Sequence, residues 1–360
     1  MRRDLVLPTV LKFKKSAMKF IVFAAIFVFI WNAHSAELDS VTPRGIELED
    51  GINEINRIIS KRLQEGIERA NSKQLNDIED TESHEFCDEK ILYDSIRSAI
   101  FQTGLSGTGS LKGYALDKQL RVLLEKFSYA LPLELSIMKD WNYLDGLSLK
   151  LKGLTSIIQV NEHLIGLDKL GHFFAEGWSY FEQAYLDGEG IREAMEWGIE
   201  KERGKFGYTT TGIFSYADLV ANFNGMRFWN RILLKNRDPL KNYFEGLIDR
   251  AYVECKYNIV ETIVHLHRQD WNVEEFKIVK AWKINHRFDF RYYLDGAWDE
   301  GINCNSYANI PLEEKISKRI QEVAPGFKCP IEAVECLRAR DKYGSYAKNI
   351  LHPNCLINHI

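Results

Sequence analysis

The chain of 360 residues has no long apolar run beyond residue 31 and little net charge for its length. Because a membrane-spanning helix needs about 20 nearly continuous apolar residues, this pattern excludes a polytopic membrane protein. A composition of 45% hydrophobic and 12% aromatic residues also excludes disorder as the main state, since such a chain can bury enough surface to fold. Internal repeats and low-complexity segments are absent as well.

Several catalytic signatures are also missing. The sequence has no Gly-x-Ser-x-Gly, His-Glu-x-x-His or Walker pattern, which argues against the commonest hydrolase and nucleotide-binding classes. The glycine-rich run at 104–110 lacks the Gly-Lys-Ser/Thr ending of a phosphate-binding loop, and we interpret it as a flexible connection. No Cys-x-x-Cys pair is present, so a zinc site is the lesser alternative to disulfides.

The N-terminus has the order of a secretory signal. Basic residues precede an apolar run from Phe20 to Trp31, and small residues follow at Ala33 and Ser35. We therefore expect residues 1–35 to be a signal peptide, with Met18 as a possible start, and the alternative is an uncleaved anchor. Their removal takes away six of the 47 basic and one of the 51 acidic residues, which changes the net charge from −4 to −9. An acidic exported chain, periplasmic or secreted, is not expected to bind nucleic acid.

The cysteines fit an oxidising compartment. An even number in an exported chain predicts up to three disulfides, although the sequence cannot choose among the pairings. Cys329 and Cys336 are close enough in sequence for a local bridge, and the crowding of cysteines after residue 300 predicts a stapled C-terminal segment. The six are Cys87, Cys255, Cys304, Cys329, Cys336 and Cys355.

Helical periodicity dominates the rest of the chain. A small hairpin is expected from the alternation at 147–152 and the apolar run at 157–160. The segment 281–307 is aromatic and acidic, and it either caps the helical core or forms a groove for sugars or lipid. The helical segments are 46–72, 87–101, 115–139, 168–187, 190–204, 215–235, 242–267 and 272–284.

These patterns predict a mainly α protein with a bundle-like globular domain and at most a small β-hairpin. We expect a helical domain over 36–300, with a cysteine-rich extension over 301–360 packed on it.

The densest polar signal lies at 166–176. On a helix, Asp168, His172 and Glu176 are four residues apart and line one face, where they could bind a metal or orient a histidine base. The plainer interpretation makes Asp168 an N-cap and leaves Glu176 solvated. His172 would then lie in the first turn, where the helix dipole favours the neutral imidazole.

A second polar signal lies at 215–225. Ser215 and Asp218 have capping-box spacing, which alone could explain both residues. Asn222 shares a face with Asp218 and is not explained in this way. Gly225 costs about 1 kcal/mol relative to Ala inside a helix, so close helix packing is its expected role.

Together, Asp168-Lys169-x-x-His172-Phe173, Gly198-x-x-x-Glu202 and Ser215-x-x-Asp218-x-x-Ala221-Asn222-x-x-Gly225 resemble the VanZ-like family and the related YfiM-like envelope proteins. The resemblance covers residues 165–230, and Glu200 is the substitute if the register of the middle glutamate differs by two. VanZ-like proteins are membrane helices, whereas charged residues interrupt these segments here, so only a water-exposed or peripheral version is implied. The resemblance implies an association with the bacterial envelope and no settled reaction.

Three functions remain open. The first is an exported envelope protein whose polar pocket binds or hydrolyses a lipid-linked or cell-wall substrate. There His172 is the base, with Asp168, Asp218 and Glu202 as catalytic partners, and Lys169, Asn222, Glu200 and Glu176 contact the substrate. The second is a metal-dependent hydrolase using His172 and carboxylates, and the third is a non-catalytic binding or scaffold protein. No other cofactor is expected, and the sequence does not predict the oligomeric state.

Overall fold

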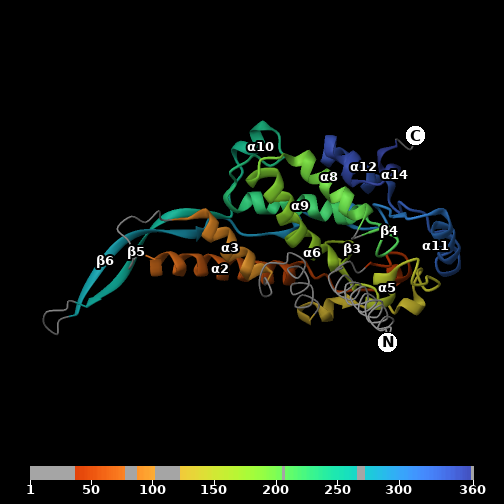
Figure 1. Ribbon diagram of the computed structural model, residues 1–360, viewed down its shortest axis with the longest axis horizontal. Helices are drawn as coiled ribbons and strands as arrows, with labels where there is room; N and C mark the ends of the chain where they lie inside the picture. The colour runs from red at the N-terminus through yellow and green to blue at the C-terminus, as the bar shows by residue number, and fades with distance from the viewer. Residues whose placement is uncertain (1–36, 78–86, 102–121, 205–206, 266–271, 358–360) are drawn as a thin grey trace, which may run out of the picture.

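The computed structural model describes residues 37–77, 87–101, 122–204, 207–265 and 272–357. Most helices gather in one body, and a long hairpin extends from it beside α2 and α3 (Figure 1). The helices are α2 Ile52–Asp77, α3 Glu89–Ile100, α5 Leu147–Lys152, α6 Asp168–Gly171, α7 Gly177–Phe181, α8 Ile191–Arg203, α9 Tyr216–Leu233, α10 Tyr243–Leu247, α11 Ile310–Val323, α12 Ala333–Tyr343, α13 Ala347–Ile350 and α14 Pro353–Leu356. The strands are β1 Ser128–Tyr129, β2 Ile157–Val160, β3 His163–Gly166, β4 Ile213–Phe214, β5 Val253–His265, β6 Asn272–Ile284 and β7 Ser306–Tyr307. The predicted mainly α class is confirmed.

Helix α9 is the centre of the body. Its residues from Ala217 to Ile232 are buried, so this helix is covered on all sides. Helix α7 crosses it closely, since a Cβ atom added at Gly225 would lie 1.9 Å from the carbonyl oxygen of Phe173 and 2.8 Å from Cα of Gly177. The expected role of Gly225 in close helix packing is therefore confirmed.

The core spans most of the chain. The periodic isoleucines and Leu63 of α2 are buried, as the helical spacing predicted. The aromatic segment 281–307 caps this core through Phe288, Phe290 and Trp298, and Ile350 and Leu351 from the C-terminal extension belong to the same apolar cluster. Among the described residues, no helix has the length and apolar character needed to cross a membrane.

The long hairpin corrects two predictions. Segments 242–267 and 272–284 were expected to be helical. Helix α10 lies at the start of the first segment, but β5 and β6 pair antiparallel from Val253 opposite Ile284 to His265 opposite Asn272. Both strands are rich in Val and Ile, which favour extended backbone. The spacing of the apolar residues also fits a helix, but the two strands are adjacent in sequence and hydrogen-bond to each other instead.

Two shorter segments also differ from the expectation. Leu147–Lys152 is helix α5 instead of a strand, and β2 pairs with β3, which follows it. The two-residue turn between them has positive φ at Asn161 (47°) and Glu162 (72°), which matches the twist of a tight hairpin. The described part of 115–139 forms 3₁₀ turns and strand β1 instead of a continuous helix. The glycine-rich run at 104–110 lies outside the described residues.

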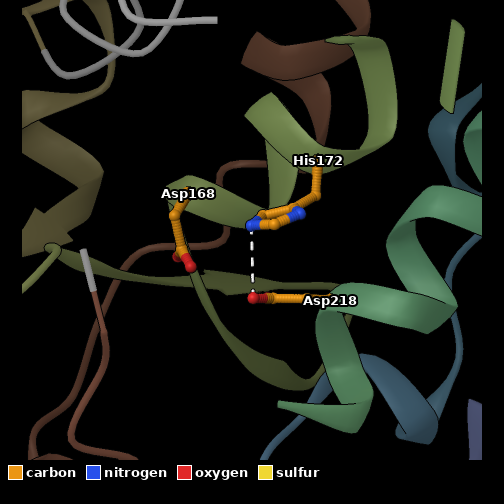
Figure 2. A group of neighbouring side chains, drawn as sticks. All are labelled: Asp168, His172 and Asp218. Atoms are coloured by element: carbon orange, nitrogen blue, oxygen red, sulfur yellow. Dashed lines mark ion pairs between the residues drawn. The ribbon is translucent and has the colours of Figure 1, made fainter. Parts of the chain in front are cut away.

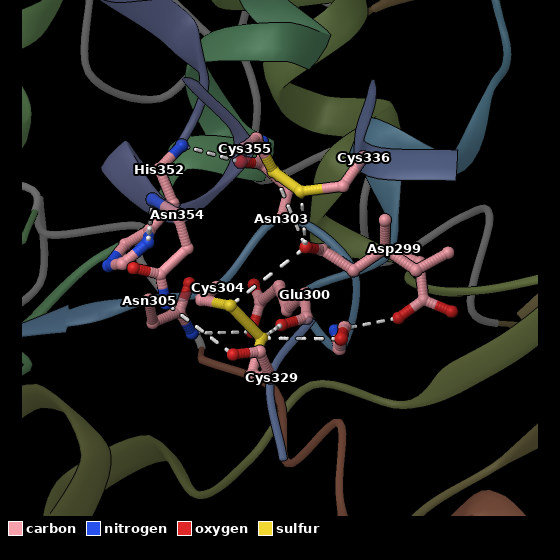
Figure 3. Close-up of a disulfide and its surroundings, with 12 residues drawn as sticks. Asp299, Glu300, Asn303, Cys304, Asn305, Cys329, Cys336, His352, Asn354 and Cys355 are labelled. Atoms are coloured by element: carbon pink, nitrogen blue, oxygen red, sulfur yellow. Dashed lines mark hydrogen bonds between the residues drawn. A yellow bond between two sulfur atoms is a disulfide. The ribbon is translucent and has the colours of Figure 1, made fainter. Parts of the chain in front are cut away.

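Three disulfides are present: Cys87–Cys255, Cys304–Cys329 and Cys336–Cys355. The expected local bridge between Cys329 and Cys336 is wrong, because Cys336 on α12 faces Cys355 on α14 while Cys329 faces Cys304 (Figure 3). Two of the three bridges staple the C-terminal segment, as predicted. This usage of cysteine is consistent with an exported protein or an oxidising compartment.

Candidate functional site

A buried ammonium group is the centre of the polar cluster. The side chain of Lys169 has no exposed surface, and its Nζ lies 2.9 Å from Asp168 Oδ2, 2.6 Å from Asp218 Oδ1 and 2.7 Å from Glu300 Oε1. Burial alone would lower the pKa of Lys169, but the surrounding carboxylates raise it well above its ordinary value. Lys169 therefore favours its charged form, in which it contacts three carboxyl groups at once.

The start of α6 places two of these groups. Asp168 is the first residue of the helix, and its side chain contacts Lys169 instead of capping the helix, so the N-cap interpretation is wrong. From His172 to Glu176 the helix widens into a π turn, in which the backbone N–H of Gly177 donates to the carbonyl oxygen of His172. Such π turns are frequent at functional sites because they change the direction of side chains.

The start of α9 supplies Asp218. Ser215 is the N-cap, and its Oγ accepts a hydrogen bond from the backbone N–H of Asp218 at 3.3 Å. The reciprocal bond comes from another helix, because the backbone N–H of Ser215 donates to Glu202 Oε1 at 3.1 Å. This arrangement leaves the Asp218 carboxylate free to face Lys169 and His172.

Three buried glutamates, Glu37, Glu202 and Glu300, also lie around Lys169. Burial, together with repulsion from Asp218, raises the pKa of Glu37 and of Glu202 well above the ordinary value, so both favour the protonated form. Burial also raises the pKa of Glu300, although Lys169 opposes this shift. Burial acts on Asp218 in the same direction, but His172 and Lys169 outweigh it and lower its pKa. Of these four acids, Asp218 therefore has the greatest tendency to be ionised.

His172 connects the cluster to the surface. Its side chain is 13% exposed, and its Nε2 lies 3.2 Å from Asp218 Oδ2. The amide of Asn222 is satisfied when its nitrogen faces the ring, where it donates to Nδ1 at 3.2 Å and to the carbonyl oxygens of His172 and Asp218 at 3.3 and 3.2 Å. In that orientation Nδ1 accepts, and Nε2 carries the hydrogen that is donated to Asp218.

Three ligand atoms converge beside His172. One atom each from Asp168, His172 and Asp218 lie within 4.8 Å of one another, and Figure 2 shows the three side chains turned toward a common point. Asp218 contacts Lys169 through Oδ1 and His172 through Oδ2, whereas Asp168 contacts Lys169 through Oδ2. Asp168 Oδ1 is buried and has no hydrogen-bond partner. The missing partner is a hydrogen-bond donor or a cation.

The other predicted site residues lie apart from this point. Glu176 is half-buried next to His172, and burial raises its pKa. Glu200 is exposed on α8, so the structure does not bring it to the cluster, whereas Glu202 is buried within it. The predicted substrate contact of Lys169 requires a correction, because its ammonium is completely enclosed by carboxylates.

Sequence reasoning missed Glu37 and Glu300. Glu300 accepts hydrogen bonds from Ser215 Oγ at 3.1 Å and from Asn305 Nδ2 at 2.8 Å. The signal available in the sequence was the run of polar residues at 299–305, which follows an aromatic segment. Glu37 had no signal, since it stands just after the expected leader. Both of its carboxylate oxygens are buried and without a hydrogen-bond partner.

Comparisons with protein-family models, curated proteins and solved structures found no match to this chain.

Proposed function

We propose that this chain is an exported, envelope-associated helical protein that hydrolyses a lipid-linked or cell-wall substrate at the point where Asp168, His172 and Asp218 converge. The single observation that carries the proposal is the convergence of the partly exposed imidazole of His172 with the buried carboxylates of Asp218 and Asp168, one oxygen of Asp168 having no hydrogen-bond partner. The substrate class rests on the resemblance of residues 165–230 to VanZ-like and YfiM-like proteins.

The chemistry assigns a role to each group. A water bound between Asp168 and His172 would donate one hydrogen to a carboxylate oxygen of Asp168 and the other to His172 Nε2, and would become more nucleophilic. Nε2 can take the proton only in the tautomer that carries its hydrogen on Nδ1, so the amide of Asn222 has to turn from the orientation in which it donates to Nδ1 to the one in which its oxygen accepts from Nδ1 at 3.2 Å. The anionic Asp218 would stabilise the resulting imidazolium, while Lys169 holds both carboxylates in place.

The test compares His172→Gln with His163→Gln, a substitution of a histidine outside the cluster. The purified protein is assayed with a chromogenic phosphate ester, a chromogenic carboxylic ester and a polyprenyl diphosphate. We expect His172→Gln to reduce turnover by a factor of about 100 or more with little change in Tm, and His163→Gln to leave turnover unchanged. Equal turnover by wild type and His172→Gln would contradict the proposal. A large drop in Tm would favour a purely structural cluster.

The convergence of three ligand atoms favours one further candidate, a metal-dependent hydrolase. A His and two carboxylates suit a divalent cation, with Asp168 and Asp218 each offering one carboxylate oxygen. Titration of metal-free protein with Zn²⁺ or Mn²⁺ distinguishes the two candidates. Binding that is lost in Asp168→Asn supports the metal site, whereas turnover without any bound metal supports the histidine base.

A further inference from the structure

Helix α10 presents a group of apolar side chains to solvent. Tyr243, Phe244, Leu247 and Ile248, which we call the α10 knob, are 64%, 78%, 66% and 79% exposed. Helix α10 stands at the outer edge of the helical body (Figure 1). Single exposed apolar residues are common on protein surfaces, but a contiguous group of them is typical of an interaction surface.

The backbone beneath the knob is firmly held. Asn242 and Glu245 form a complete capping box at the start of α10. After the helix, Asp249 Oδ1 lies 3.0 Å from Arg231 Nη2 and 2.8 Å from Lys241 Nζ, and the backbone N–H of Tyr252 donates to the carbonyl oxygen of Arg231. The knob is therefore exposed by an ordered scaffold that is anchored on both sides of the helix.

A pocket with a cationic lining adjoins the knob. It has a volume of about 550 Å³ and shares Ile248 with the knob. Arg231, Lys241, Arg250 and His286 line it, together with the ring of Tyr292. Arg231 lies over that ring, with its Cζ 4.0 Å from the centroid. The pocket is built from side chains of α9, the α10 segment and the turn after β6.

The charges in this pocket are incompletely neutralised. Arg231 and Lys241 share the single carboxylate of Asp249. Among the described residues, Arg250 has no acidic side chain within ion-pair distance, and the acid Glu245 is turned to the backbone N–H of Asn242. A chain with a net charge of −4 thus carries a local excess of positive charge directly beside an exposed apolar group.

We propose that this face docks on a bilayer that contains anionic phospholipid. The α10 knob enters the interfacial region, where Tyr and Phe side chains are favoured, and the pocket takes the phosphate of one headgroup. A bilayer with anionic headgroups complements this face, because it offers negative charge to the cations and an apolar interior to the α10 knob. The proposal does not depend on hydrolysis at His172, and its readout is binding alone.

The test is co-sedimentation of the purified mature chain with vesicles of phosphatidylcholine alone or of phosphatidylcholine mixed with phosphatidylglycerol. We expect binding only to the mixed vesicles. Arg250→Gln should weaken it about fivefold, the effect of one cation near an anionic surface, and Phe244→Ser combined with Leu247→Ser should abolish it. The controls Leu144→Ser and Arg192→Gln alter exposed residues outside this face, and these variants should bind as wild type does.

Several outcomes would overturn the proposal. Equal binding to both vesicle types would show that the pocket does not bind an anionic headgroup. Binding of the double serine variant at the wild-type level would show that the α10 knob does not contact the bilayer. Self-association that disappears in the same variant, without vesicle binding, would assign the face to a second copy of the chain. Binding of soluble glycerol phosphate without any vesicle binding would assign the pocket to a free phosphate. All substitutions are on exposed side chains, so we expect each variant to fold. An unchanged Tm verifies this.

Discussion

At the scale of single residues, Lys169 determines whether the polar cluster is stable. Its ammonium is enclosed by Asp168, Asp218 and Glu300, and a buried carboxylate without a partner is costly. Replacing Lys169 with Met leaves these charges uncompensated, so we expect a loss of about 3–5 kcal/mol in the free energy of unfolding, measured by urea denaturation.

The control for this variant is Lys61→Met, since the Lys61 side chain is 69% exposed and lies 3.8 Å from Glu65. It should change stability by less than about 0.5 kcal/mol. Adding Glu300→Gln to Lys169→Met removes one of the stranded charges and should restore part of the lost stability. A Lys169→Met variant as stable as wild type would show that the carboxylates protonate without cost.

A pH dependence follows from Glu202. Its pKa is raised by burial and by Asp218, so the folded chain holds this proton more tightly than the unfolded chain does. The stabilisation is present below the unfolded pKa of about 4.3 and is lost as the pH rises toward the raised folded pKa. Glu202→Gln removes this titration while its amide oxygen still accepts from Ser215.

Thermal and urea unfolding of both proteins between pH 5 and pH 8 measure this effect. The stability of wild type relative to Glu202→Gln should fall with rising pH, by at most about 1.4 kcal/mol per pH unit for one proton. Parallel stability curves for the two proteins would mean that Glu202 is ionised across this range.

At the scale of elements, the crossing of α7 and α9 positions His172 against Asp218. The two backbones meet where Gly177 lies against Gly225, and a Cβ atom at Gly225 would be 1.9 Å from the carbonyl oxygen of Phe173. Gly225→Ala must therefore separate the helices, and we expect a loss of at least about 1–3 kcal/mol in stability. The His172 to Asp218 contact would lengthen as well.

Gly171→Ala is the matched control, because a Cβ atom there meets nothing within 4 Å and the residue has ordinary helical φ and ψ. It should stabilise the protein by up to about 1 kcal/mol through the helix preference of Ala. If both variants lost equal stability in urea denaturation, the crossing of α7 and α9 would not be the cause.

The elements also show how far the sequence predicts this fold. Helices α2 and α8 each have one apolar face, and the spacing of their apolar residues predicts them. Helix α9 is buried on all sides, although the sequence predicts a helix over nearly the same residues, 215–235. The hairpin of β5 and β6 was misinterpreted, because its apolar residues also fit helical spacing. Only the pairing with the partner strand distinguishes the two structures.

The same limit applies to the site. Asp168, Lys169, His172 and Asp218 were found because local spacing places them on two helix starts. Glu37 and Glu300 were missed because only long-range packing brings them to Lys169. Spacing also cannot tell that a lysine is enclosed, which is why Lys169 was expected to contact substrate.

At the scale of the whole molecule, the three disulfides close loops of very different length. Cys87–Cys255 joins the segment before α3 to β5 across a sequence separation of 168, whereas Cys336–Cys355 joins α12 to α14 across a separation of 19. In the chain-entropy model a bridge stabilises by restricting the unfolded chain, and the longer loop is restricted more. The model gives about 5 kcal/mol for the long loop and about 3 kcal/mol for the short one.

We therefore expect Cys87→Ser with Cys255→Ser to lower the free energy of unfolding more than Cys336→Ser with Cys355→Ser does. Burial opposes this order, since Cys336 and Cys355 are each about 1% exposed and lie in the core cluster, while Cys255 is exposed. Urea denaturation of both double variants decides which effect is larger. A greater loss in the C-terminal variant would mean that packing around α12 and α14 outweighs loop entropy.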